Sequence, residues 1–288
     1  MIRPVDWSHI GLLVLVGVSG GLFGSALGVG GGAFIVPLLT LAMRMPVKET
    51  IACSIVAVAG TACASAASYI KAGFTNVRLA LLLETTTTAG AIAGAFLAAL
   101  IDARVLAGLF AMAVIYTAYS MFRQRSKLET FAATCDVEAA GGGFHDSLSG
   151  SYHDSACQSG ISYRVKRVKV GLGASSLAGV LSGLLGIGGG VVQVPVMNMA
   201  MGVPMKAAVG TSSFMIGITA IASAFVYYQK GFVDPMAAGP VLVGVFIGVQ
   251  IGVRAVRRVQ AGTLKLVFSI ILTGVAALML LRAAGIVS

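Results

Sequence analysis

The sequence predicts an all-α polytopic membrane protein that consists of two inverted repeats joined by a polar linker. Three observations lead to this fold class. The composition is 57% hydrophobic and only 10% charged over 288 residues, whereas about a quarter of the residues of soluble domains are charged. Apolar stretches long enough to span a membrane recur along the whole chain. A glycine-rich string also occurs twice, once in each half.

The apolar stretches give the expected helical segments in chain order. They lie at residues 10–43, 50–70, 79–101, 105–122, 170–201, 207–228, 236–253 and 263–281. Helices are expected because a membrane barrel would instead show short strands of alternating hydrophobicity. The first stretch runs on to Met43 without a cleavage pattern, so we expect it to stay in the protein and not to be removed as a signal peptide.

The glycine-rich string establishes the repeat. "ALGVGGGAFIVPLL" at 26–39 returns as "LLGIGGGVVQVPVM" at 184–197, and adding 158 to a residue number in the first half gives its partner in the second. The match needs no gap over roughly a hundred residues, as expected of duplicated structural units. The sequence therefore predicts a first membrane repeat at 1–122, a linker at 123–168 and a second membrane repeat at 169–288.

The length of the first apolar stretch indicates that the repeats are inverted. Its 34 residues are too many for one spanning helix of about 20 residues and too few for two. Two short segments broken at the glycines would return the chain to its starting side, which gives each repeat about five helical segments. Of the 20 Lys and Arg residues, 14 then lie on one face and six on the other, against 12 and eight for a single kinked span. The positive-inside rule thus favours both termini outside and the linker in the cytoplasm.

The linker holds Cys135, His145, His153 and Cys157, whose spacings match none of the usual paired zinc-ligand motifs. We therefore expect no metal there. "GSYHD" at 150–154 and "ISYRVKR" at 161–167 are instead predicted to pair as a small cytoplasmic β-hairpin with a turn at "CQSG". The basic run "RVKRVK" would hold this segment at the membrane surface.

The two glycine strings predict a binding site for an anion. Inverted-repeat transporters bind substrate near the bilayer midplane, where paired helices are interrupted by Gly and Pro and face a cavity. The amides of the glycine loops, and of the helix starts at Ala33 and Val191, would donate hydrogen bonds to an anion. A nucleotide-binding loop is disfavoured because neither copy follows a strand or precedes a Lys-Ser/Thr pair. Close helix packing through small residues stays open as an alternative.

At these residues the sequence resembles the sulfite exporter TauE/SafE family of membrane permeases. The resemblance rests on "SGLLGIGGGVVQVPVM", on "GVPMKAAVGTSSFMIG" after it, on the matching first-half copy and on "SGSYHDSACQSGISYRVKR" before the second half. It covers nearly the whole chain. It implies a carrier in the cytoplasmic membrane for sulfite or small organosulfonates, usually assigned to export.

The candidate ligands of the anion are hydrogen-bond donors available in both halves, because an anion inside a membrane must replace its lost hydration. They are Gly28, Gly30, Gly31, Gly32, Thr40, Ser54, Gly186, Gly188, Gly189, Gly190, Gln193, Asn198, Thr211 and Ser212. Tyr69 and Tyr227 add polar groups near the segment ends. For each hydroxyl, a hydrogen bond back to a carbonyl of its own helix is the alternative.

Glu84, in "LALLLETTTTAGAIAG", has no basic residue within five positions on either side. A carboxylate inside a membrane is a functional hypothesis by default. Its partner in the repeat is Leu242, so the two halves differ here, as a coupling residue would require. We predict that Glu84 carries a coupling proton. A structural hydrogen bond to the threonines at 85–88 and a position at the protein surface are the alternatives.

These observations predict a secondary transporter that works by alternating access, with no cofactor. An enzyme is disfavoured because the predicted spans contain no His and Glu84 is their only clear acid. The expected partners are a small sulfur-containing anion and membrane lipid, and a homodimer stays open. Nucleic acid is not expected, since the net charge of +10 lies in short loops and in the linker. A carrier or channel for another solute or cation, and a non-transporting sensor or assembly protein, remain alternatives.

Overall fold

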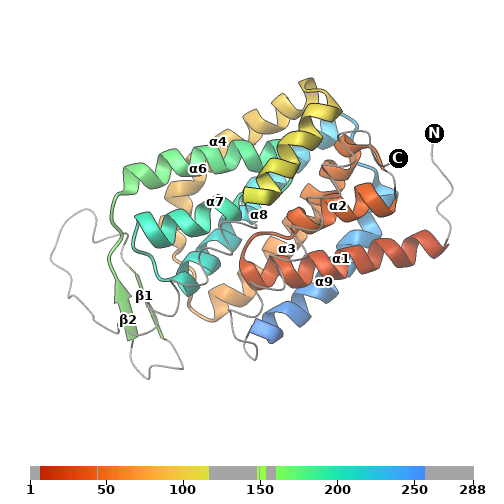
Figure 1. Ribbon diagram of the computed structural model, residues 1–288. Coiled ribbons are helices and arrows are strands. Elements are labelled where there is room, and N and C mark those ends of the chain that lie inside the picture. The colour runs from red at the N-terminus through yellow and green to blue at the C-terminus, as the bar shows by residue number, and fades with distance from the viewer. Residues whose placement is uncertain (1–6, 44, 117–147, 149, 154–159, 257–288) are drawn as a thin grey trace.

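The computed structural model describes residues 7–43, 45–116, 148, 150–153 and 160–256, and these form a bundle of helices (Figure 1). In chain order the elements are α1 (Trp7–Leu27), α2 (Gly32–Ala42), α3 (Val47–Lys71), α4 (Val77–Leu100), a helix at Ala103–Tyr116, β1 (Gly150–His153), β2 (Gly160–Tyr163), α6 (Val168–Leu185), α7 (Gly190–Pro195), a π-helical turn η2 (Val196–Ala200), α8 (Met205–Gln229) and α9 (Pro235–Val256). Five of these helices, α3, α4, α6, α8 and α9, are long and apolar enough to cross a membrane. The predicted all-α polytopic class is confirmed.

The repeat in the sequence is also a repeat of elements. α3 and α8 both have 25 residues, and their bounds differ by 158. The 11 residues of α2 correspond in the same way to α7 followed by η2. The first half has the five expected segments, whereas the fifth segment of the second half lies outside the described residues. α1 begins at Trp7, before the predicted stretch, and therefore includes His9.

The predicted break at the glycines is confirmed. Gly28, Gly30 and Gly31 have φ angles of 66°, 89° and 83°, which favour glycine because a Cβ disfavours the left-handed region. The break also reverses the chain, since the rings of Phe23 and Phe34 stack at 4.8 Å between centroids. α2 therefore runs back along α1 (Figure 1).

Helices of one half pack along helices of the other, with α1 beside α9 and α4 beside α6 (Figure 1). Glycines allow these close approaches, because a Cβ on Gly17 would overlap the backbone of Val241 and one on Gly21 the backbone of Val245. The contact passes from Gly17 and Val241 to Gly21 and Val245, so residue numbers increase in the same direction along both helices. α1 and α9 are therefore parallel. The α4–α6 contact is built in the same way from its own glycines.

The two linker strands pack at one end of the bundle. β1 and β2 pair antiparallel, with Gly150 opposite Tyr163, which confirms the predicted pairing; the turn itself lies outside the described residues, as do Cys135, His145 and Cys157. The Asn76 side chain, between α3 and α4, donates to the Leu148 carbonyl at 2.8 Å and to the Tyr163 hydroxyl at 3.2 Å. The strands are thus fastened to the end of the bundle at which α4 begins.

The opposite end carries the loops that follow α2, α4 and α8. Lys48 Nζ donates to the Ala99 carbonyl at 2.9 Å and lies 5.7 Å from the centroid of the Phe232 ring. Lys230 Nζ lies 5.6 Å from the ring centroid of Phe96. The bundle therefore has a hairpin end, defined by residues 72–76, 150–153 and 160–167, and an opposite end, defined by residues 45–49 and 229–234.

Candidate functional site

The two glycine loops face each other inside the bundle. A Cβ on Gly30 would lie 3.7 Å from the Cα atom of Gly188, and a Cβ on Gly32 would overlap the carbonyl of Gly186. Likewise, a Cβ on Gly190 would overlap the Gly28 carbonyl. Both loops are buried. The structure therefore brings together the predicted glycines of the two halves, and their lack of side chains lets the loops touch.

Two of the predicted hydroxyls connect the halves across this contact. Ser54 Oγ, on α3, donates to the carbonyl oxygen of Gly186 at 3.0 Å. Ser212 Oγ, its repeat partner on α8, donates to the carbonyl oxygen of Gly28 at 3.3 Å. The last carbonyls of a helix have no partner within that helix. Each serine therefore satisfies a carbonyl at the glycine break of the other half.

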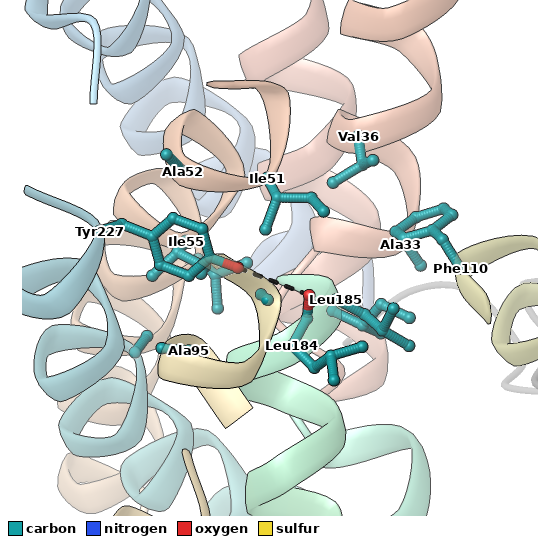
Figure 2. Packing of buried hydrophobic residues seen from close by; sticks show 14 of the residues in the cluster. Ala33, Val36, Ile51, Ala52, Ile55, Ala95, Phe110, Leu184, Leu185 and Tyr227 are labelled. Atoms are coloured by element: carbon teal, nitrogen blue, oxygen red, sulfur yellow. Dashed lines mark hydrogen bonds between the residues drawn. The ribbon is translucent and has the colours of Figure 1, made fainter. Parts of the chain in front are cut away.

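Two tyrosines satisfy further carbonyls at the same helix ends. Tyr69 donates to the carbonyl oxygen of Ser25 at 2.9 Å, and its repeat partner Tyr227 donates to that of Gly183 at 3.1 Å. Figure 2 shows the Tyr227 ring within the hydrophobic cluster, with its hydroxyl directed at the Leu184 carbonyl at 3.5 Å. Burial of the ring and the bond of its hydroxyl together fix the end of α6.

The other predicted hydroxyl and amide groups make hydrogen bonds elsewhere. Thr40 donates to a carbonyl one turn earlier on α2 at 2.7 Å, which is the expected alternative for a helical hydroxyl. The Asn198 side chain donates to the Val203 carbonyl at 3.0 Å. Thr211 Oγ1 accepts from the backbone N–H of Asn76 at 3.0 Å. These contacts stabilise the start of α8 and of α4; whether any of these side chains binds an anion stays a prediction.

Glu84 lies in a buried polar cluster. Only 5% of its surface is exposed, which excludes a position at the protein surface. Its Oε1 atom accepts from Thr88 Oγ1 at 2.6 Å and from Thr219 Oγ1, on α8, at 2.7 Å. Its Oε2 atom is buried without a hydrogen-bond partner. The predicted bond to a following threonine is present, whereas Thr219 was not anticipated, because its contact crosses between halves.

Gln193 belongs to the same cluster and not to the contact between the loops. It lies on α7, is only 3% exposed, and its Nε2 atom donates to Thr87 Oγ1 at 3.4 Å. Its Oε1 atom is buried without a partner. Two buried acceptor oxygens, one of Glu84 on α4 and one of Gln193 on α7, therefore lack donors among the described residues.

An apolar cavity of about 350 Å³ lies between the helix Ala103–Tyr116, α6 and α7. Leu109 and Met112 line it from the first of these helices, and Leu181 lines it from α6. The cavity reaches Ser182 and the second glycine loop at Gly189.

Comparison with known proteins identifies relatives over almost the whole chain. A sequence model of the family described as "Sulfite exporter TauE/SafE" matches residues 13–279. A "probable membrane transporter protein YunE" of Bacillus subtilis is 26% identical over 269 residues, 91% of this chain and 93% of the relative. A "probable membrane transporter protein" of Xylella fastidiosa is 28% identical over 271 residues, 92% of this chain and 93% of the relative. No solved structure matches the chain significantly.

Proposed function

Because the chain belongs to the sulfite exporter TauE/SafE family, we propose that it is a secondary transporter that exports sulfite or a small organosulfonate across the cytoplasmic (inner) membrane. The observation that carries the proposal is the contact between two repeat-related glycine loops, each satisfied by a serine of the other half. The relatives carry the broader description of membrane transporters.

The start of α2 supplies donors suited to an oxyanion, whereas the predicted amides of Gly30, Gly186 and Gly190 donate to backbone carbonyls. The first hydrogen bonds of α2 are donated by Phe34 and Ile35 to the Gly31 carbonyl, at 3.0 and 3.2 Å. The amides before them have no acceptor within the helix, and the helix start carries a partial positive charge. A small separation of the two loops would let Ser54 and Ser212 turn from backbone carbonyls to the oxygens of an anion.

Inverted repeats are supported by helix directions. α4 is parallel to α6, because Gly90 faces Ser176 and Gly94 faces Val180, just as α1 is parallel to α9. α2 runs back along α1, and short loops then reverse the chain into α3 and again into α4, so α4 runs against α1. α6 then also runs against its repeat partner α1. This relation suits an axis in the membrane plane and alternating access around a central site.

The charges support a cytoplasmic hairpin end. Among the described residues, eight basic side chains lie towards that end and three towards the other; the eight are Lys71, Arg78, Arg164, Lys166, Arg167, Lys169, Lys206 and Arg254, and the three are Lys48, Arg104 and Lys230. This bias follows the positive-inside rule. In this orientation the first helix begins outside the cell.

We further propose that Glu84 couples transport to a proton gradient. Its carboxylate is buried, is hydrogen-bonded on one oxygen only among the described residues, and has no basic residue within five positions in sequence. Such a carboxylate becomes neutral by taking up a proton, because a lone buried charge in a membrane is costly. Leu242 at the repeat-related position leaves one such group for each chain.

The experiment is uptake of labelled sulfite into proteoliposomes with and without an imposed proton gradient, with unlabelled taurine or sulfoacetate as competitor. We expect uptake that responds to the gradient and falls when a sulfonate is added. Uptake at the same rate with and without the proton gradient would contradict proton coupling. Folded protein that moves none of the three compounds would contradict the substrate class and leave the family fold intact.

A further inference from the structure

The cluster between α4, α7 and α8 holds two buried oxygen atoms that lack a donor, Glu84 Oε2 and Gln193 Oε1. Both side chains are at least 95% buried. A buried acceptor without a donor costs about 1–3 kcal/mol, and more when it is charged. Two such atoms in one cluster indicate that a positively charged or donating group belongs between these helices.

The two side chains contact neighbouring threonines of α4. Thr88 Oγ1 lies 2.6 Å from Glu84 Oε1, and the adjacent Thr87 Oγ1 lies 3.4 Å from Gln193 Nε2. Thr219 adds a third hydroxyl from α8 at 2.7 Å from the carboxylate. α7 and α8 thus each contribute a polar side chain to the same stretch of α4, Gln193 at Thr87 and Thr219 at Glu84.

No basic side chain neutralises this carboxylate from the helices packed around it. The basic groups on those helices and at their ends are Arg78 on α4, Arg167 and Lys169 at the start of α6, Lys206 on α8 and Lys230 just after α8, all near helix ends; α7 and η2 carry none. A single buried negative charge therefore lacks a protein partner in the described part of the chain.

The cluster occurs once, although its surroundings are repeated. The positions that correspond to Glu84, Thr87 and Gln193 are Leu242, Val245 and Ile35. The position that corresponds to Thr219 is Thr61, which donates to the Ala57 carbonyl of its own helix at 2.9 Å. The packing of the repeat therefore does not require these polar groups.

We propose that Glu84 and Gln193 form a binding site for one monovalent cation, either a proton held on Glu84 Oε2 and donated to Gln193 Oε1 or Na⁺ held between these two oxygen atoms. Oxygen atoms are the ligands that hard cations prefer. One carboxylate balances one positive charge, whereas a divalent ion would leave a net charge buried in the membrane. This site deepens the coupling role in the proposed function and rests on it only for the link to transport.

The position of Gln193 provides that link. It lies three residues after Gly190, on the helix that begins at the second glycine loop. A cation that joins Gln193 to Glu84 therefore fixes α7 against α4 and α8, and with it one side of the contact between the glycine loops. Loss of the cation frees α7 to move.

The test is thermal unfolding of the purified protein in NaCl or in choline chloride at equal ionic strength, at alkaline and at mildly acidic pH. We expect Na⁺ to raise the Tm of the wild type by about 5 °C at a hundredfold excess over its Kd, and Glu84→Gln and Gln193→Met to abolish the rise. Thr61→Val, at the repeat-related position, should keep it. If the cation is a proton, acid instead stabilises the wild type relative to both variants and Na⁺ has no effect.

An identical response of the wild type and Gln193→Met to both Na⁺ and acid would overturn the proposal. If Gln193→Met does not fold, equilibrium binding of radioactive Na⁺ and the acid response are compared between the wild type and Thr219→Val, where an unchanged response would overturn it equally. A cation response without sulfite transport would contradict the proposed function and leave this site standing. Sulfite transport without a cation response would contradict this site and the coupling role of Glu84, and would leave the proposed transport of sulfite standing.

Discussion

At the scale of single residues, the glycine loops combine a backbone requirement with a packing requirement. Gly30 needs its positive φ of 89°, whereas Gly32 needs the absence of a Cβ because the Gly186 carbonyl occupies that place. The sequence predicts the break from the recurrence of these residues. It does not predict that the loops touch each other, because that contact joins residues more than 150 positions apart.

Gly32→Ala should destabilise the fold by about 1–3 kcal/mol, the usual cost of overpacking a tight core. The new Cβ would overlap the carbonyl of Gly186. Thermal unfolding in detergent measures the change, with Gly11→Ala as the control, since a Cβ on Gly11 would have no atom within 4 Å. Equal Tm values for the two variants would contradict the close contact between the loops.

The repeat partners Ser54 and Ser212 show which contacts a sequence pattern can predict and which it cannot. The repeat identifies both as matched polar positions, and the structure places both at the glycine breaks. Their partners on the opposite half could not be derived, because helix periodicity fixes only contacts within a helix. For the same reason the contact of Thr219 with Glu84 could not be predicted, whereas the threonines that follow Glu84 on α4 were predicted as hydrogen-bond partners.

At the scale of elements, the sequence predicts the order of the helices, the reversal at the glycines and the two linker strands. It does not predict the π-helical turn at Val196–Ala200. Pro195 precedes this turn and cannot donate a backbone hydrogen bond. Its repeat partner Pro37 lies inside a regular α2, so proline alone does not explain the turn. π-helical turns are frequent at functional sites, and this one follows Gln193.

Asn76 is the residue that holds the linker strands to the bundle, and no sequence pattern singled it out. Its side chain accepts from the Leu79 amide at 3.1 Å as the N-cap of α4, and donates to Leu148 and Tyr163. Burial raises the pKa of the Tyr163 hydroxyl above its usual value, so this group stays neutral at physiological pH. The contact therefore persists over the range in which the protein works.

Asn76→Ala should loosen the linker strands and lower stability by about 1 kcal/mol or more, through loss of the cap and of two further hydrogen bonds. We expect faster amide hydrogen exchange in β2, measured by mass spectrometry. Gln229→Ala, at an exposed helix end, serves as the control. Unchanged exchange in β2 would show that Asn76 does not anchor the strands.

At the scale of the whole molecule, the account depends on two halves of opposite orientation. The length of the first apolar stretch and the count of basic residues predict this arrangement, and the helix directions support it. The pair Lys71 and Gln229 tests it, because the two residues are repeat partners and both are exposed. In a parallel repeat they would lie on the same side of the membrane, and in an inverted repeat on opposite sides.

In a variant without its native cysteines, Gln229→Cys should react with an impermeant maleimide in intact cells. Lys71→Cys should react only after the cells are made permeable, because it lies at the hairpin end, which we place in the cytoplasm. Labelling of both positions from the same side would contradict inverted repeats. Reversed labelling would keep the repeats and overturn the orientation.

The central claim is that the two glycine loops and their serines bind the transported anion. Uptake of labelled sulfite by Ser212→Ala, compared in proteoliposomes with Ser213→Ala, tests it most directly. Ser213 is also buried but donates to the Val209 carbonyl of its own helix at 2.9 Å. We predict that Ser212→Ala lowers uptake about tenfold or more, since a hydrogen bond to a charged group contributes about 1.5–3 kcal/mol, and that Ser213→Ala transports like the wild type. Equal uptake by the two folded variants would contradict the claim.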